Sequence, residues 1–107
     1  MWLNSVILSS SPKGFMHMDL NARPLQQANF HSEVLEQEII LYFPGGGQFL
    51  YLNQTAALVW ERCDGLLTAN EIIQGLQTVF PEAAEEIQGD VESTLQSFLK
   101  HGCISLV

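Results

Sequence analysis

Few residues in this chain have the type and spacing that chemistry requires. A catalytic site needs a nucleophile beside a base, a pair of acids, a metal cluster or a phosphate-binding loop. His17 in "MHM" is a weak soft-metal motif, and the carboxylates of "EAAEE", Asp90 and Glu92 are typical of a solvated helix surface. We therefore expect no catalytic residue, no metal site and no cofactor.

The glycine-rich stretch and the two cysteines favour structural roles. "PGGG" lacks the Lys and Ser/Thr of a phosphate loop and separates two strand-like segments, which indicates a tight turn. Cys63 and Cys103 fit neither a zinc motif nor a disulfide framework, so we expect two small buried hydrophobic residues. His31 and His101 are interpreted as structural.

Composition narrows the class of protein. A chain of 107 residues with 47% hydrophobic content suits one globular domain with a modest core. Its net charge of -8 repels nucleic acid, and no apolar run reaches the ~20 residues that a membrane span needs. The N-terminus has no cationic residue ahead of its short apolar patch, unlike a secretory signal. We expect a cytoplasmic protein without nucleic-acid or membrane partners.

The first half of the chain predicts an arm and a sheet. Residues 1–28 show no sustained period and are interpreted as an N-terminal arm or tail. From Phe30 to Leu52, "FHSEVL", "EIILYF" and "QFLYL" predict three short antiparallel strands. The middle strand is apolar on both faces, so either the arm or a second copy of the chain should cover the face away from the core. A homodimer therefore stays open.

The second half predicts three helices. Ala56, Val59, Trp60 and Cys63 follow the spacing of one helical face, with Asn53 as N-cap and "DG" as the end. Thr68 and Glu71 have the spacing of a capping box, which starts the next helix. Its buried stripe is predicted to comprise Ile72, Ile73, Leu76, Val79 and Phe80.

The third helix, from about Ala83 to His101, has Gly102 as its cap. Its apolar side is predicted to comprise Ile87, Val91, Leu95, Phe98 and Leu99. "CISLV" follows as a short extended end. The expected fold is α+β, a three-stranded antiparallel sheet followed by three helices, similar to a winged helix-turn-helix.

Several motifs together resemble one known family. "YLNQTAALVWERCDG", followed by "LLTANEI" and later by "DVESTLQSFLKHGCI", is similar to the PqqD-like proteins, the chaperones of pyrroloquinoline quinone biosynthesis. The resemblance covers residues 29–107, which we take as the peptide-recognition domain, and leaves residues 1–28 outside it. It implies the same α+β fold and a non-catalytic role as a recognition element for ribosomally made, modified peptides.

The resemblance also implies a binding site. In the family, the leader segment of the precursor peptide adds as a strand beside the third strand, in the groove facing the third helix. Carried onto this chain, the edge comprises Gln48, Phe49, Leu50, Tyr51 and Leu52. The facing helix positions are Ile87, Asp90, Val91, Thr94 and Ser97. Ile87 and Val91 also suit the core. Asp90 is the residue to test first, as the partner of a cationic residue of the leader.

The resemblance further implies a maturation enzyme as partner, such as a radical SAM protein or a leader peptidase. Two alternatives remain from the sequence. The winged-helix topology alone would suit DNA binding, but the second helix has no basic residue and the third has only Lys100. A general interaction domain of the same fold with another protein partner also stays open.

Overall fold

The computed structural model describes residues 18–43 and 49–107. Local sequence signals define most of its elements. In chain order these are β1 (Pro24–Gln26), β2 (His31–Leu35), β3 (Glu38–Tyr42), β4 (Phe49–Leu52), α1 (Gln54–Glu61), α2 (Ala69–Val79), the 3-10 turn η1 (Pro81–Ala83), α3 (Ala84–Lys100) and β5 (Ile104–Leu106). The predicted α+β class, a three-stranded antiparallel sheet followed by helices, is confirmed. The turn predicted for "PGGG" lies outside the described residues.

Helix starts follow the predicted caps. The side chain of Asn53 accepts from the Ala56 amide at 2.9 Å, so α1 begins with one of its free amides satisfied. At α2, the Thr68 amide donates to Glu71 Oε1 at 2.9 Å and the Glu71 amide donates to Thr68 Oγ1 at 3.1 Å. This reciprocal pair is a complete capping box, and it sets the first turn of α2 from local sequence alone.

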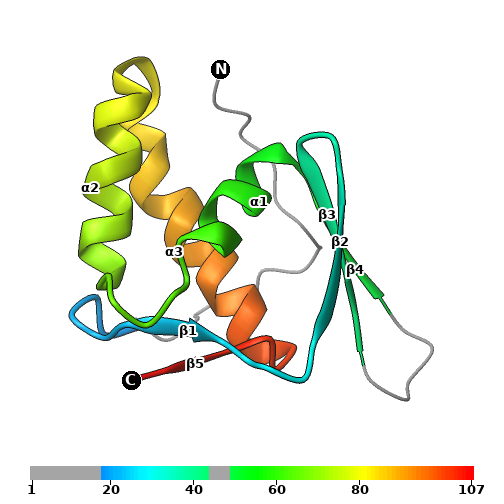
Figure 1. Ribbon diagram of the computed structural model, residues 1–107. Helices are drawn as coiled ribbons and strands as arrows, with labels where there is room; N and C mark the ends of the chain where they lie inside the picture. The colour runs from blue at the N-terminus through cyan, green and yellow to red at the C-terminus, as the bar shows by residue number, and fades with distance from the viewer. Residues whose placement is uncertain (1–17, 44–48) are drawn as a thin grey trace.

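The main sheet has the strand order β2-β3-β4, with antiparallel pairing throughout. Its register pairs Tyr42 with His31 and with Phe49, and Ile40 with Glu33 and with Tyr51. All three helices lie on one side of this sheet (Figure 1). On β3 and β4 the side chains that point to the helices are buried, whereas β2 is exposed along its whole length. The side chains on the side away from the helices form what we call the outer face.

One core joins the sheet to the helices. Buried residues of β3 and β4 pack with those of α1, α2 and α3 in a single cluster. Trp60 of α1 meets Phe98 of α3 edge to face, with ring centroids 5.4 Å apart. Of the predicted α2 stripe, Ile72, Ile73 and Leu76 are buried, whereas Val79 is 59% exposed because it ends the helix where the chain turns into η1.

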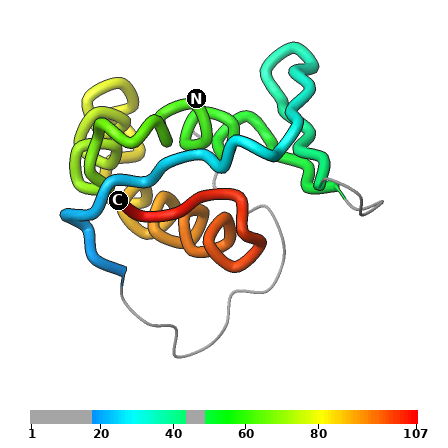
Figure 2. The backbone as a smooth tube through the Cα atoms, turned by 60° about the horizontal axis from the view of Figure 1, so that its bottom comes forward, coloured from blue at the N-terminus to red at the C-terminus, as the bar shows by residue number. Residues whose placement is uncertain are grey.

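A second, two-stranded sheet joins residues from opposite ends of the sequence. β1 pairs with β5 antiparallel, Leu25 opposite Ser105. The two strands lie side by side below the helices (Figures 1 and 2). Part of the segment that we interpreted as an arm therefore takes part in the fold, and the extended end predicted for "CISLV" has a partner strand.

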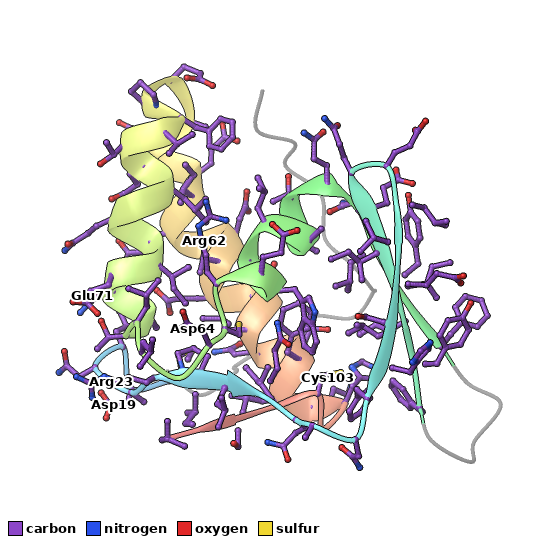
Figure 3. The ribbon with its side chains drawn as sticks, viewed as in Figure 1. Asp19, Arg23, Arg62, Asp64, Glu71 and Cys103 are labelled. Carbon is purple, nitrogen blue, oxygen red and sulfur yellow. The ribbon has the colours of Figure 1, made fainter. Side chains whose placement is uncertain are left out.

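The connection between α1 and α2 is tied to β1. Asp64 Oδ1 accepts from the Leu66 amide at 2.8 Å, and the Gly65 amide donates to the Pro24 carbonyl at 2.8 Å. Gly65 has a φ of 80°, in the left-handed region. Figure 3 shows Asp64 in this connection and Cys103 close to β5. The predicted "DG" turn thus also holds β1 in place through a main-chain hydrogen bond.

Among the described residues, no helix is both long and apolar enough to span a membrane.

Candidate functional site

The predicted peptide-accepting strand is β4, at one edge of the main sheet. Within the described part of the chain, β4 pairs with β3 and with no other strand. Phe49, Leu50, Tyr51 and Leu52 all belong to β4, while Gln48 lies outside the described residues. An edge strand carries a row of amides and carbonyls that an added strand can use.

The side chains of β4 alternate between core and solvent. Leu50 and Leu52 are 3% and 0% exposed, whereas Phe49 and Tyr51 are 62% and 45% exposed. A strand period of two produces this alternation when one face of the sheet lies against the helices. The inward pair therefore fixes β4 in the core, and the outward pair remains accessible for contact with another molecule.

The predicted positions on α3 divide into two groups. Ile87, Val91 and Thr94 are buried, so their first role is to hold α3 against the core. Asp90 and Ser97 are half-buried and lie seven residues apart, on the same flank of the helix. Of the five helix residues that the sequence suggested, these two are therefore the most accessible to a ligand.

α3 and β4 belong to the same core but are joined indirectly. α1 contacts both β4 and α3, and Leu50, Leu52, Ile87 and Val91 share one buried cluster. The C-terminal end of α3 approaches the sheet at Phe43, just after β3, whose ring lies 6.3 Å from that of His101. His101 follows Ser97 by four residues and therefore lies on the same side of α3 as Asp90 and Ser97. At His101 this side of the helix comes close to the sheet.

The outer face carries tyrosine–glutamate pairs that sequence reasoning missed. The Tyr42 hydroxyl donates to Glu33 Oε1 at 3.0 Å, and the Tyr51 hydroxyl is hydrogen-bonded to Glu38. These bonds, together with partial burial and the neighbouring negative charge, raise the pKa of both phenols above the ordinary value. Each pair joins diagonal neighbours on adjacent strands, so only the strand register could have revealed it.

The two thiols do not form a reactive site. Cys63 and Cys103 are free and fully buried, as the sequence predicts. Burial raises the pKa of the Cys63 thiol to about 12, with a smaller effect from Asp64, and raises that of Cys103 to about 11. A nucleophilic thiol needs the opposite shift, so both side chains serve as packing groups.

The acidic side chains and possible metal ligands of the described ranges do not gather into one cluster. There, no group of three or more His, Cys, Asp and Glu side chains is placed to hold a metal ion. The carboxylates of Glu82, Glu85 and Glu86 are exposed. Their position on the surface agrees with the solvated helix face that the sequence indicates.

Comparison with known proteins identifies a family. Residues 38–104 match the family described as "Coenzyme PQQ synthesis protein D (PqqD)". The chain is 35% identical over 68 residues to a "PqqA binding protein" of Acinetobacter baylyi (strain ATCC 33305 / BD413 / ADP1), covering 64% of this chain and 67% of that protein. A "PqqA binding protein" of Methylococcus capsulatus (strain ATCC 33009 / NCIMB 11132 / Bath) is 33% identical over 72 residues, covering 67% and 73%. No solved structure matches the chain significantly.

The fold and the site together define a small α+β domain with an open edge strand and a packed helical layer behind it. Within that class, the chain belongs to the PqqD family. The resemblance on which the sequence analysis relied is thereby confirmed.

Proposed function

We propose that this protein is a non-catalytic recognition element, which binds the leader segment of a ribosomally synthesised precursor peptide and presents it to a modifying enzyme. Two relatives that match about two thirds of the chain are named as PqqA binding proteins, and this observation carries the proposal. The ligand class is a peptide, and PqqA is the first candidate. The modifying enzyme would be a radical SAM protein or a leader peptidase.

The edge of β4 supports binding by strand addition. Main-chain hydrogen bonds to an edge strand give affinity to almost any extended peptide, and side-chain pockets then decide which peptide binds. The described β4 has one partner strand, β3, and Leu50 and Leu52 fix it to the core. Such a strand can receive a peptide without rearrangement of the fold.

The accessible flank of α3 supplies the second wall in this proposal. Asp90 and Ser97 offer a carboxylate and a hydroxyl at half-buried positions, and Ile87, Val91 and Thr94 support them from the core side. A cationic leader residue suits Asp90, because a charge pair at a half-buried site is less screened than one on the open surface. Gln48 lies outside the described residues, and its part in the binding edge stays a prediction.

The direct test is a titration of the full-length protein with synthetic PqqA peptide, followed by calorimetry or NMR. A panel of peptides with single N-methylated amides then tests the binding mode. In strand addition every second amide of the peptide bonds to β4. We expect N-methylation to lower affinity by about tenfold or more at alternate residues and little at those between them.

The intervening residues of the same peptide are the matched control. This design leaves the protein unaltered, which matters because proline at the buried Leu50 would also damage the core. Absence of binding to PqqA, with binding to a different protein partner, would favour the general interaction domain. Binding without an alternating N-methyl pattern would retain the peptide ligand but refute strand addition.

A cytoplasmic location forms part of this proposal. Cys63 and Cys103 are both free thiols inside the core, which suits a reducing compartment. The precursor peptide is made on ribosomes in the cytoplasm, so a protein in the same compartment meets the precursor as soon as it is made. We treat the monomer as the active form, and sedimentation of the full chain with and without peptide tests whether a homodimer forms instead.

A further inference from the structure

The outer face of the main sheet has an unusual composition for an exposed surface. A sheet packed on one face normally presents polar residues on the other. Here the solvent side carries Leu35, Tyr42, Phe49 and Tyr51, which are 37–62% exposed, together with the half-buried Ile40. Within the segment interpreted as an arm, Pro24–Gln26 pair with β5 and not with this face, and residues 1–17 lie outside the described residues. Contiguous exposed apolar surface of this kind typically marks a contact site.

The charges on this face have one sign. Glu33 and Glu38 lie among the apolar side chains, and β2, β3 and β4 contain no Lys or Arg. Residues 18–107 contain all 12 acidic residues and 3 of the 4 basic ones, which gives -12 + 3 = -9. A second copy of the chain would bring the same carboxylates against each other, which disfavours it as occupant. A cationic and apolar partner is complementary to this surface.

The strand register fixes where such a partner would meet the face. His31, Tyr42 and Phe49 form one row across the sheet, and Glu33, Ile40 and Tyr51 form the next. Both rows end at β4, the edge that strand addition uses. A peptide strand beside β4 therefore extends both rows, with one outward residue opposite Phe49 and another, two positions along, opposite Tyr51.

From these observations, and resting on the proposed function, we infer that the outer face selects the leader peptide: it takes an apolar residue opposite Phe49 and a Lys or Arg opposite Tyr51. The apolar residue covers the exposed ring of Phe49. The cationic residue lies over the Tyr51 ring, whose hydroxyl holds the Glu38 carboxylate, so ring and carboxylate act together on one charge. The peptide residues opposite Phe49 and Tyr51 are two positions apart whether the added strand runs parallel or antiparallel to β4.

The experiment uses the full-length protein and the peptide bound in the titration above, with each residue replaced in turn by Leu, Ser, Lys and Glu. We expect one position at which Leu binds about tenfold more tightly than Ser. Two residues away, Lys should bind severalfold more tightly than Glu at low salt, and the difference should shrink as salt is added.

Variants of the protein assign these preferences to the outer face. Phe49→Ser should remove the preference for Leu over Ser, and Glu38→Gln should narrow the preference for Lys over Glu. Glu85→Gln is the matched control, because it makes the same charge change at an exposed position in the first turn of α3. Tyr51→Phe keeps the ring but loses the hydrogen bond to Glu38, so it should narrow the Lys preference in part.

The possible failures are distinct. If no peptide binds, the proposed function fails first. If the peptide binds but Phe49→Ser and Glu38→Gln leave both preferences unchanged, this inference is overturned while the function stands. A dimer in sedimentation that Phe49→Ser dissociates would assign the face to a second copy. If Phe49→Ser bound the peptide more tightly than the unaltered protein does, residues 1–17 of the chain itself would be the occupant that competes for the outer face. Either result overturns the inference.

Discussion

Asp90 combines a carboxylate with a half-buried position on the flank of α3. If it pairs with a cationic residue of the leader, Asp90→Asn should weaken peptide binding by about three- to tenfold at low ionic strength, and the effect should fade as salt screens the charge. Calorimetric titration at two salt concentrations measures this. Glu92→Asn, on another side of the same helix, serves as control. Equal affinities of Asp90→Asn and the unaltered protein at low salt would refute the pairing.

The buried thiols predict a loss of stability in alkali. Burial raises the pKa of Cys63 to about 12 in the folded state, whereas an unfolded thiol has a pKa near 8.5. Below pH 8.5 both states are protonated, so stability is fully present. Above that pH the unfolded state loses its proton first, and the free energy of unfolding falls with rising pH up to the folded pKa.

The measurement for this prediction is denaturant unfolding from pH 8 to pH 11. The slope contributed by Cys63 is up to about 1.4 kcal/mol per pH unit. Cys63→Ala should flatten the alkaline slope, although it also removes the Sγ contact to the Val59 carbonyl at 3.3 Å. A variant with an unchanged slope would show that the thiol does not titrate differently in the two states.

At the scale of elements, three glycines should respond differently to alanine. Gly75 in α2 and Gly89 in α3 have nothing within 4 Å of an added Cβ, and alanine restores helix propensity. We expect each substitution to stabilise the protein by about 0.5–1 kcal/mol. Gly65 differs, because its φ is 80° and an added Cβ would lie 3.0 Å from Leu25 Cδ1.

Gly65→Ala should therefore destabilise the protein, by about 1–2 kcal/mol from backbone conformation alone. Chemical denaturation of the three variants provides the comparison, and the two helical glycines are controls for the change in side chain itself. Equal effects at Gly65 and Gly75 would mean that the turn between α1 and α2 tolerates another backbone conformation.

At the scale of the whole molecule, β5 should contribute to global stability. Ile104 is 4% exposed within the common core, and its strand bonds to β1 from the other end of the described chain. Ile104→Ala should cost about 2–5 kcal/mol, whereas Ser105→Ala on the same strand should change stability by about 0.5 kcal/mol or less. Thermal or denaturant unfolding measures both.

Hydrogen exchange gives an independent check of the pairing between β1 and β5. The amides of Arg23 and Val107 each donate to the other's carbonyl, at 3.0 and 2.9 Å, and the Gln27 amide donates to the Cys103 carbonyl at 2.9 Å. These three amides should exchange slowly in the native protein. Rapid exchange at all of them would show that β1 and β5 open independently of the core.

Local signals in the sequence determined much of this protein. The N-cap at Asn53, the capping box of Thr68 and Glu71 and the Gly102 cap each act within a few residues. The strand and helix periods likewise predicted the main elements. The order of these motifs was enough to indicate the PqqD family, because a family is recognised along the chain.

The tertiary structure alone decided which surfaces are covered. All of β2 is exposed although its sequence alternates, since α1 contacts β3 and β4 and the core stops short of β2. The pairing of β1 with β5 and the bond from Tyr42 to Glu33 join residues that are distant in sequence or lie on different strands. Such contacts depend on register and packing between elements, which no local pattern encodes. For the same reason, the sequence could suggest the edge of β4, while only the fold showed the acidic, aromatic face beside it.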